Sequence, residues 1–136
     1  MRNYLSAIKE FDYQHTMESA LAGSLSALNA CVECCDRHAL PGRIALFWEG
    51  RDGSSASYTF TELQDKAGRL ANFFLAQGVG KGDKVAGLLP RNVELLITVL
   101  ATWRIGAVYQ PLFTAFGPEA IEHRLNSSKA KLVVSD

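Results

Sequence analysis

The spacing of hydrophobic residues changes along the chain, and each change indicates the start of a new strand or helix. The runs RIALFW and ASYTF are rich in β-forming residues and flank EGRDGSS, in which Asp52-Gly53 is a turn signal. Residues 43–60 are therefore expected to form a β-hairpin. The spacing then becomes helical, with one apolar face made of Leu63, Ala67, Leu70, Ala71 and Phe74. Thr61 and Gln64 are predicted to form a capping box, and the helix is expected to end at Gly78.

Strands and helices alternate through the rest of the chain. KVAGLLP, AVYQPL and KLVVSD are apolar runs of strand length, and the first is typical of a strand buried on both faces of a parallel sheet. Asn92 is expected to cap a helix that ends at Gly106, and Pro118 to open the next helix. The core face of the Asn92 helix is expected to carry Val93, Leu96, Leu100 and Trp103. A hairpin followed by helix–strand units predicts an α/β fold with a mostly parallel sheet.

The first forty residues give a weaker pattern. A short amphipathic stretch and an Ala/Ser-rich connector form an N-terminal extension, residues 1–28. Asn29 is expected to cap a helix that begins at Ala30 and is stopped by Pro41-Gly42. Residues 29–136 then form one α/β subdomain. We expect it to be incomplete at its C-terminus, because KLVVSD ends where a doubly wound domain turns into its next loop.

Composition limits the classes of partner. The chain has 136 residues, of which 48% are hydrophobic, and this suits one domain with its own core. The 14 basic and 14 acidic side chains balance, so no nucleic-acid partner is expected. No uncharged run reaches the roughly twenty residues of a membrane span, so no membrane partner is expected. The 3 cysteines are clustered in CVECC, which favours a reducing compartment and a cytoplasmic location.

The stretch GVGKGDKVAG, residues 78–87, is rich in glycine and lysine, as phosphate-binding loops are. Such a loop follows a strand and opens a helix, because its amides and the helix N-terminus must point at phosphate. Here Gly78 ends a helix and a strand comes next. Lys81 is also followed by Gly82, where the motif has Ser or Thr. The stretch is therefore interpreted as a helix-to-strand turn.

Candidate metal ligands and catalytic groups occur around the cysteines. The residues of zinc-ligand type that would share one helical face are Cys31, Cys34, Cys35 and His38. Four donors on one straight helix do not surround a metal tetrahedrally, so we interpret them as a core-facing stripe and predict no metal site. Asp36 and His38 lie two apart and do not face each other, and no catalytic set is predicted. Arg91 and Arg104 are interpreted as solvated or paired surface groups.

An ordered block of residues carries a family resemblance. Its members are Tyr58-Thr59-Phe60, Glu62-Leu63, Gly78-Val79, Lys81-Gly82-Asp83, Val85-Ala86, Pro90, Glu94 and Gly106-Ala107-Val108. The block resembles the N-terminal region of adenylate-forming enzymes, the superfamily of acyl-CoA synthetases, luciferases and nonribosomal adenylation domains. The flanking runs, LNACVECCDRHALPGRIALFWEGRDG and PLFTAFGPEAIEHRLNSSKAKLVVSD, are similar to acetyl-CoA synthetases and related short- and medium-chain acyl-CoA ligases. The resemblance extends from Leu28 to Asp136 and implies the N-terminal subdomain of that fold.

The resemblance also implies a two-step reaction in a parent enzyme. A carboxylate attacks the α-phosphorus of MgATP to give an acyl-adenylate and pyrophosphate, and the thiol of CoA then displaces AMP. The cofactors would be ATP, Mg²⁺ and CoA, and the partners the carboxylic acid and the remainder of the ligase. In the family a Ser/Thr/Gly-rich loop ending in lysine holds the triphosphate, and no such run occurs in this sequence. The chain alone is expected to be inactive and to bind no cofactor tightly.

Phe113 and Phe116 bracket the run FTAF at the carboxyl end of a predicted strand, where α/β sheets bind ligands. In acetyl-CoA synthetases a glycine pair stands at the places of Thr114 and Ala115, near the entry of CoA. The resemblance implies that Phe113, Ala115 and Phe116 line the CoA side of the site. Because both glycines are missing here, a close approach of CoA to the backbone is disfavoured. The alternative is that the two phenylalanines close the core.

A second hypothesis is a stand-alone, non-catalytic binding or interaction module. The two hypotheses differ in what they expect of the surface. A fragment whose missing part normally covers its sheet exposes apolar area and self-associates through the sheet edge. A module that evolved to act alone is monomeric and has covered edges.

Overall fold

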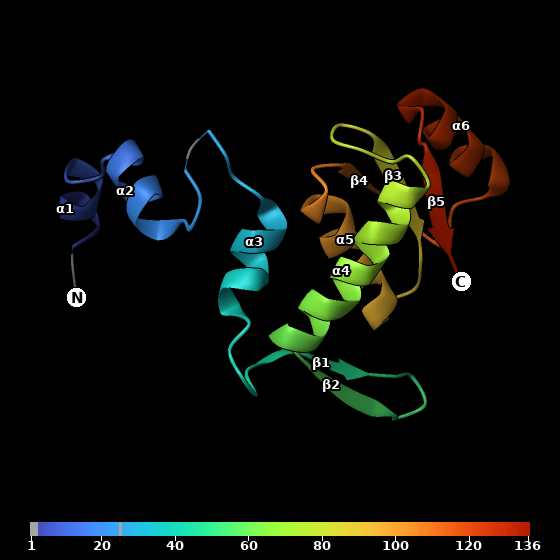
Figure 1. Cartoon of the computed structure of the whole chain (residues 1–136), viewed down its shortest axis with the longest axis horizontal. Helices are drawn as coiled ribbons and strands as arrows, with labels where there is room; N and C mark the ends of the chain where they lie inside the picture. The colour runs from blue at the N-terminus through green and yellow to red at the C-terminus, as the bar shows by residue number, and fades with distance from the viewer. Residues whose placement is uncertain (1–2, 25) are drawn as a thin grey trace.

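Two separate sheets and six helices make up the part of the chain that is described, residues 3–24 and 26–136, in the computed structural model (Figure 1). Met1, Arg2 and Leu25 belong to the predicted extension 1–28 and lie outside the described residues. The helices are α1 (Tyr4–Lys9), α2 (Tyr13–Ala20), α3 (Ala30–Cys34), α4 (Phe60–Ala76), α5 (Val93–Arg104) and α6 (Pro118–Ser128), with a 3₁₀ turn η1 (Asp36–His38). The strands are β1 (Ile44–Glu49), β2 (Ser55–Thr59), β3 (Lys84–Leu88), β4 (Val108–Pro111) and β5 (Leu132–Ser135).

The predicted parallel sheet is confirmed. Its order is β4-β3-β5, and β3 pairs in parallel with both neighbours, with Val85 opposite Tyr109 on one side and Leu132 on the other. The middle of β3 is fully buried, as its uninterrupted apolar run predicts. The α/β class expected from the alternating pattern is therefore correct.

The predicted hairpin is confirmed as well. β1 and β2 are antiparallel, with Phe47 opposite Ser57 and Trp48 opposite Ala56. The turn contains Gly53 at φ +82°, a left-handed conformation that glycine adopts without strain. Because side chains alternate along a strand, one face of the hairpin turns towards the helices and the other outwards.

Helix α4 starts two residues earlier than the sequence pattern predicts. Thr59, not Thr61, is the N-cap: its hydroxyl accepts from the amide of Glu62 at 3.1 Å, and the Glu62 carboxylate accepts from the Thr59 amide at 2.7 Å. The predicted capping box of Thr61 and Gln64 is wrong, because Thr59 ends β2 and already has the extended backbone that an N-cap requires. The predicted core face is correct, with four fully buried positions, Leu63, Ala67, Ala71 and Phe74.

Helix α5 is buried on more than its predicted face. Asn92 caps it by accepting from the Leu95 amide at 3.1 Å, as expected. Thr98 and Thr102 are also fully buried, and each hydroxyl donates to the carbonyl one turn earlier, to Glu94 and Thr98, at 2.7 Å. These bonds satisfy the hydroxyls inside the core, so α5 can pack against α4 on one side and the parallel sheet on the other.

Helix α3 is shorter than expected. Asn29 caps it as predicted, but the helix stops at Cys34, and Cys35 leaves the helical region at φ −130°, ψ −63°. Cys31 and Cys35 are buried, whereas Cys34 is exposed, so the predicted core-facing stripe is correct for two of the cysteines and wrong for the third. Helix α2 was not expected from the sequence. Its N-cap is Asp12, whose carboxylate accepts from the His15 amide at 2.7 Å.

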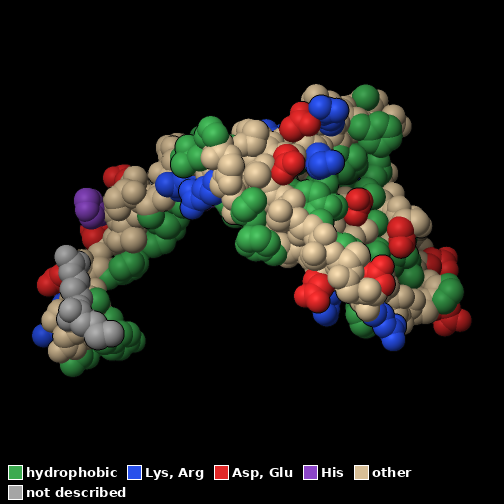
Figure 2. Space-filling model, turned by 90° about the horizontal axis from the view of Figure 1, so that it is seen from below, with side chains coloured by type: hydrophobic (Ala, Val, Ile, Leu, Met, Phe, Trp, Pro, Cys, Tyr) green, Lys and Arg blue, Asp and Glu red, His purple; other side chains and the backbone are tan. Residues whose placement is uncertain are grey.

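The N-terminal helices form an arm that curves away from the body of the molecule (Figure 2). The end of the arm that joins α3 is held by the Glu33 carboxylate of α3. This carboxylate accepts hydrogen bonds from the amides of Ala22 and Gly23 at 3.0 and 2.9 Å. These bonds lower the pKa of Glu33. Large apolar side chains exposed along the arm are Tyr4, Leu5, Ile8, Phe11 and Tyr13. None of the helices in the described residues is long and apolar enough to cross a membrane.

Candidate functional site

The topology places a crevice at the carboxyl ends of β3 and β4. The connection through α5 runs from β3 to β4, and the connection through α6 runs back past β3 to β5. Right-handed crossovers in opposite directions put the two helices on opposite faces of the sheet. The loops after β3 and β4 therefore diverge, and the space between them is where open α/β sheets bind ligands.

A cavity of about 810 Å³ occupies this position. Its lining comes from the loop after β3, the end of β4 with the loop that follows, one residue of α5 and one of the hairpin turn. The lining residues are Arg51, Leu89, Pro90, Arg91, Leu95, Tyr109, Pro111, Leu112, Phe113, Thr114 and Phe116. Leu89 and Leu112 are buried, so the interior of the crevice is apolar and fixed by the core.

Two of the three predicted CoA-side residues line this crevice. Phe113 and Phe116 stand edge to face with ring centroids 5.6 Å apart, and the Arg124 guanidinium lies 4.1 Å from the Phe116 centroid. Ala115 is exposed between them and is not part of the lining. Phe113 is 60% exposed, so it does not close the core. Whether these residues contact CoA stays a prediction.

The crevice also contains polar groups that the sequence did not single out for a site. Arg91 lies in the loop after β3, and Arg51 lies in the hairpin turn. The indole N–H of Trp48 donates to the carbonyl of Arg91 at 2.8 Å, which joins the hairpin to the loop after β3. Arg91 could have been noticed as a cation at the end of a parallel strand. Arg51 could not, because only the docking of the hairpin brings it to the crevice.

Tyr109 adds a hydroxyl without a partner. The side chain lies over Gly87 of β3, where an added Cβ would collide with the Tyr109 ring and hydroxyl. Gly87 therefore makes room for the tyrosine. The hydroxyl is buried, and no described residue hydrogen bonds to it. Burial raises the pKa of Tyr109, so the hydroxyl stays protonated and can both donate and accept.

The glycine-rich stretch before β3 is a turn, as predicted. The carboxylate of Asp83, which belongs to this stretch, binds an amide of the turn. The Asp83 carboxylate accepts from the Gly80 amide at 2.8 Å and pairs with Lys131 at 2.9 Å. The ammonium of Lys131 also donates to the Gly78 carbonyl at 2.5 Å. The amide and the lysine hold the pKa of Asp83 below its ordinary value. A carboxylate thus takes the amide that a phosphate loop would offer to phosphate.

In the described residues no three His, Cys, Asp or Glu side chains are grouped so that they could hold a metal ion, in the cysteine region or elsewhere. Cys31 and Cys35 lie in the core, and burial raises the pKa of Cys31 to about 11, so its thiol is protonated at neutral pH. In the described residues no hydrogen bond or ion pair joins Asp36 to His38. Asp36 pairs instead with Arg104 of α5 at 2.6 Å. The region is therefore a structural joint between α3 and α5.

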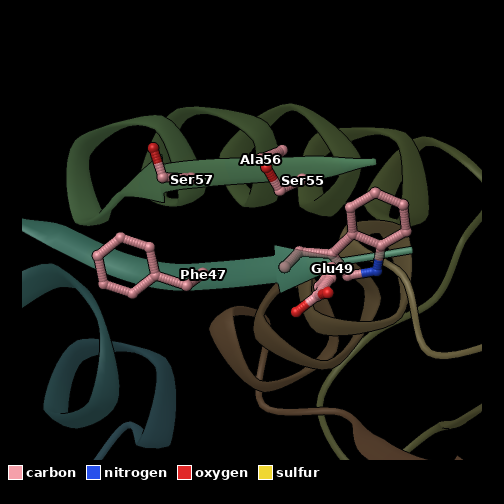
Figure 3. A pocket seen from close by; sticks show the side chains of 6 residues that line it. Phe47, Glu49, Ser55, Ala56 and Ser57 are labelled. Carbon is pink, nitrogen blue, oxygen red and sulfur yellow. The ribbon is translucent and has the colours of Figure 1, made fainter. Parts of the chain in front are cut away.

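A second hollow, of about 440 Å³, lies on the outer face of the hairpin. Figure 3 shows Phe47 and Ser57 on one part of this face and Glu49 and Ser55 on another. Phe47 is 80% exposed. In the described residues no hydrogen bond joins the Glu49 carboxylate to either serine hydroxyl, so this face shows no activated nucleophile. Phe47 is thus an exposed ring among polar neighbours, and no described residue covers it.

Comparisons with known proteins agree with this fold. The acetyl-coenzyme A synthetase of Sodalis glossinidius (strain morsitans) is 44% identical in an alignment 111 positions long, which covers 79% of this chain and 17% of that protein. The acetyl-coenzyme A synthetase of Bacillus subtilis (strain 168) is 34% identical in an alignment 139 positions long, which covers 99% of this chain and 24% of that protein. A crystal structure of Brucella canis acyl-CoA synthetase superposes with a TM-score of 0.94 at 47% identity.

That superposition covers 99% of this chain and 25% of the Brucella canis chain. The chain thus spans a quarter or less of the length of these relatives. The fold is that of acyl-CoA synthetases, as the sequence resemblance implies. A family model described as AMP-binding enzyme matches residues 35–136, which is most of the chain. The chain belongs to the family of AMP-binding enzymes.

Proposed function

We propose that this chain is the N-terminal part of an AMP-forming acyl-CoA synthetase of the acetate–CoA ligase type. The parent enzyme joins a carboxylic acid to CoA through an acyl-adenylate, at the expense of MgATP. The observation that carries the proposal is the superposition of 99% of this chain, at 47% identity, on one quarter of an acyl-CoA synthetase. The relatives named acetyl-coenzyme A synthetase support acetate or a similar short acid as the substrate class.

Within that enzyme, this chain supplies one wall of the CoA side. The crevice beyond β3 and β4 has an apolar interior with Leu89 and Leu112 buried in its floor, and Phe113 and Phe116 at its margin. An uncharged, amide-bearing arm such as that of CoA suits this lining, since the unpartnered hydroxyl of Tyr109 can hydrogen bond to an amide. The residues that stabilise charge around the α-phosphorus, as the carboxylate attacks and pyrophosphate leaves, belong to the remainder of the parent ligase, which we propose as the main partner.

The proposal predicts no chemistry by the 136-residue chain alone. The test measures acid-dependent exchange of labelled pyrophosphate into ATP, with acetate and then propionate as the acid. We expect no exchange by the purified chain. We expect exchange by a longer product, if the coding sequence beyond Asp136 continues into a Ser/Thr/Gly-rich loop ending in lysine. Robust exchange by the short chain, or none by such a longer product, would refute the proposal.

The parent reaction is proposed to take place in the cytoplasm. The three cysteines are free thiols, and a reducing compartment keeps thiols in this state. Fusing a fluorescent protein to the longer product and locating it in cells tests this point. A signal confined to another compartment would contradict it.

A stand-alone interaction module is the second candidate, and the exposed surface distinguishes the two. The arm and the outer face of the hairpin expose large apolar side chains, and both outer strands of the parallel sheet lack a further partner in the described residues. These features favour a fragment of a larger enzyme, in which the rest of the protein covers the exposed surfaces, over a stand-alone module. Sedimentation analysis of the purified chain should therefore show self-association. A stable monomer over a wide concentration range would favour the module.

A further inference from the structure

The two arginines of the crevice differ from the others in the chain. Neither the Arg51 nor the Arg91 guanidinium has an ion pair, a side-chain hydrogen bond or an aromatic contact in residues 3–24 and 26–136. Every other arginine in this range has such a partner, namely Arg37 with Glu33, Arg43 with Phe60, Arg69 with Asp65, Arg104 with Asp36, and Arg124 with Phe116. The crevice lining includes no Asp or Glu. Two unpaired cations without a counter-charge therefore border one apolar cavity.

We propose that Arg51 and Arg91 form a phosphate-binding subsite of this crevice, and that the phosphate belongs to CoA. This inference rests on the proposed function. It assigns the two residues a positioning role: they hold the nucleotide end of CoA while the uncharged arm lies in the crevice. Arginine suits this role because its planar guanidinium binds phosphate oxygens through two parallel hydrogen bonds.

The fold brings the two arginines together through Trp48. This residue is in β1, close to the turn that carries Arg51, and its indole N–H donates to the Arg91 carbonyl at 2.8 Å. The neighbouring acid Asp52 is already engaged, because its carboxylate accepts from the amide and hydroxyl of Ser54 at 3.0 and 2.6 Å. The hairpin is thus fixed to the loop after β3, and both guanidinium groups stay available to an anion.

The inside of the crevice explains why CoA is favoured over a small anion. Its floor contains Leu89 and Leu112, both buried, and offers nothing to a bare phosphate. The buried hydroxyl of Tyr109 has no partner in the described residues and needs one. The pantetheine arm of CoA is uncharged, carries amide groups and ends in phosphates. An apolar channel with one hydrogen-bonding hydroxyl and a cationic border matches that order of groups.

The experiment is an NMR titration of the ¹⁵N-labelled chain with CoA, pantetheine, MgATP and inorganic phosphate, each to millimolar concentration. We expect CoA to shift the amide signals of the non-proline residues in the ranges 88–92 and 109–116. Arg51→Gln and Arg91→Gln should each weaken CoA binding by up to about fivefold, the upper limit for an exposed charge pair. Neither variant should change the binding of pantetheine, which has the same arm without the phosphates.

Arg69→Gln is the matched control, because Arg69 lies on α4 and its side chain is 79% exposed. It should leave the CoA titration unchanged. The amide spectra away from the crevice show whether each variant is folded. CoA binding that neither crevice variant weakens, or no crevice shifts at millimolar CoA, would overturn the subsite.

Equal weakening for MgATP and CoA, with the same amides shifted, would overturn the assignment to CoA and leave a general nucleotide-phosphate site. These outcomes are separate from the proposed function. That function is tested by pyrophosphate exchange in the longer product, which depends on the acid and ATP but not on CoA. Exchange without crevice binding would therefore refute only the subsite.

Discussion

The guanidinium of Arg104 lies 2.6 Å from the carboxylate of Asp36, and this pair joins the end of α5 to the turn after α3 across 68 positions of sequence. A second bond closes the same joint, from the side-chain amide of Asn29 to the Arg104 carbonyl at 3.0 Å. The side chains of Arg104 and Asp36 are only 28% and 16% exposed. If one partner is removed, water therefore cannot fully solvate the charge of the other.

Asp36→Ala is therefore expected to lower the free energy of unfolding by about 1–3 kcal/mol, since it leaves a half-buried guanidinium without its charged partner. Urea denaturation measures the change. Asp65→Ala is the matched control, because Asp65 pairs with Arg69 on the surface of α4, where both side chains are more than half exposed. That control should cost about 0–0.5 kcal/mol. Equal costs for the two variants would show that the Asp36 pair is no stronger than a surface pair.

The start of α4 gives a second prediction. Thr59→Ala removes the hydroxyl that accepts from the Glu62 amide and should cost about 1 kcal/mol. Thr61→Ala should cost much less, because Thr61 is an exposed residue in the first turn and caps nothing. Thermal or urea unfolding of the two variants compares the costs. A larger loss for Thr61→Ala would contradict the observed cap.

Burial predicts which cysteine reacts. Cys34 is exposed, whereas Cys31 and Cys35 are in the core with raised pKa values. Ellman's reagent at neutral pH should modify one thiol per chain quickly and the other two only after unfolding. Cys34→Ser should abolish the fast phase. A fast phase that survives in this variant would mean that α3 opens in solution.

The raised pKa of Cys31 also predicts a loss of stability in alkali. The folded state keeps the thiol proton up to about pH 11, whereas the unfolded chain releases it near the ordinary value of 9.0. Because the folded state binds more protons in this range, the free energy of unfolding should fall as the pH rises from 9 towards 11. Urea denaturation at a series of pH values measures this slope. Cys31→Ala should show a shallower fall than the wild type, and an identical fall would contradict the assignment to Cys31.

Phe47 offers a test of the outer face of the hairpin. This ring is 80% exposed on the outer face of the hairpin, so Phe47→Ser should weaken self-association and leave the fold intact. Sedimentation velocity at several concentrations measures the effect. Phe73→Ser is the control, because Phe73 is 52% exposed on α4, away from the hairpin. If Phe73→Ser has the same effect, association is not specific to the hairpin.

Local rules were enough to predict most of the fold. The caps at Asn29 and Asn92, the turn at Gly53 and the alternation of strands with helices each depend on neighbouring residues, and each is present in the structure. The wrong capping box arose where two local signals competed. Thr59 and Thr61 each precede a residue that can complete a capping box, and only the end of β2 decides between them.

The candidate site was less predictable, because tertiary contacts create it. Phe113 and Phe116 could be placed from their position after a strand. Arg51 reaches the crevice only because Trp48 docks the hairpin on the loop after β3. The orphan hydroxyl of Tyr109 depends on the small neighbour Gly87 in the adjacent strand. Neither relation leaves a signal in the spacing of the residues.

The place of β3 in the sheet bears on how the chain reaches its fold during synthesis. β3 is the central strand and also the first of the three to be made, so β4 and β5 each emerge from the ribosome after their partner. Each new strand can pair with a strand that already exists, at the cost of closing only the loop that contains its own crossover helix. The sheet can therefore grow outwards from its centre as translation proceeds, without waiting for a distant segment of the chain.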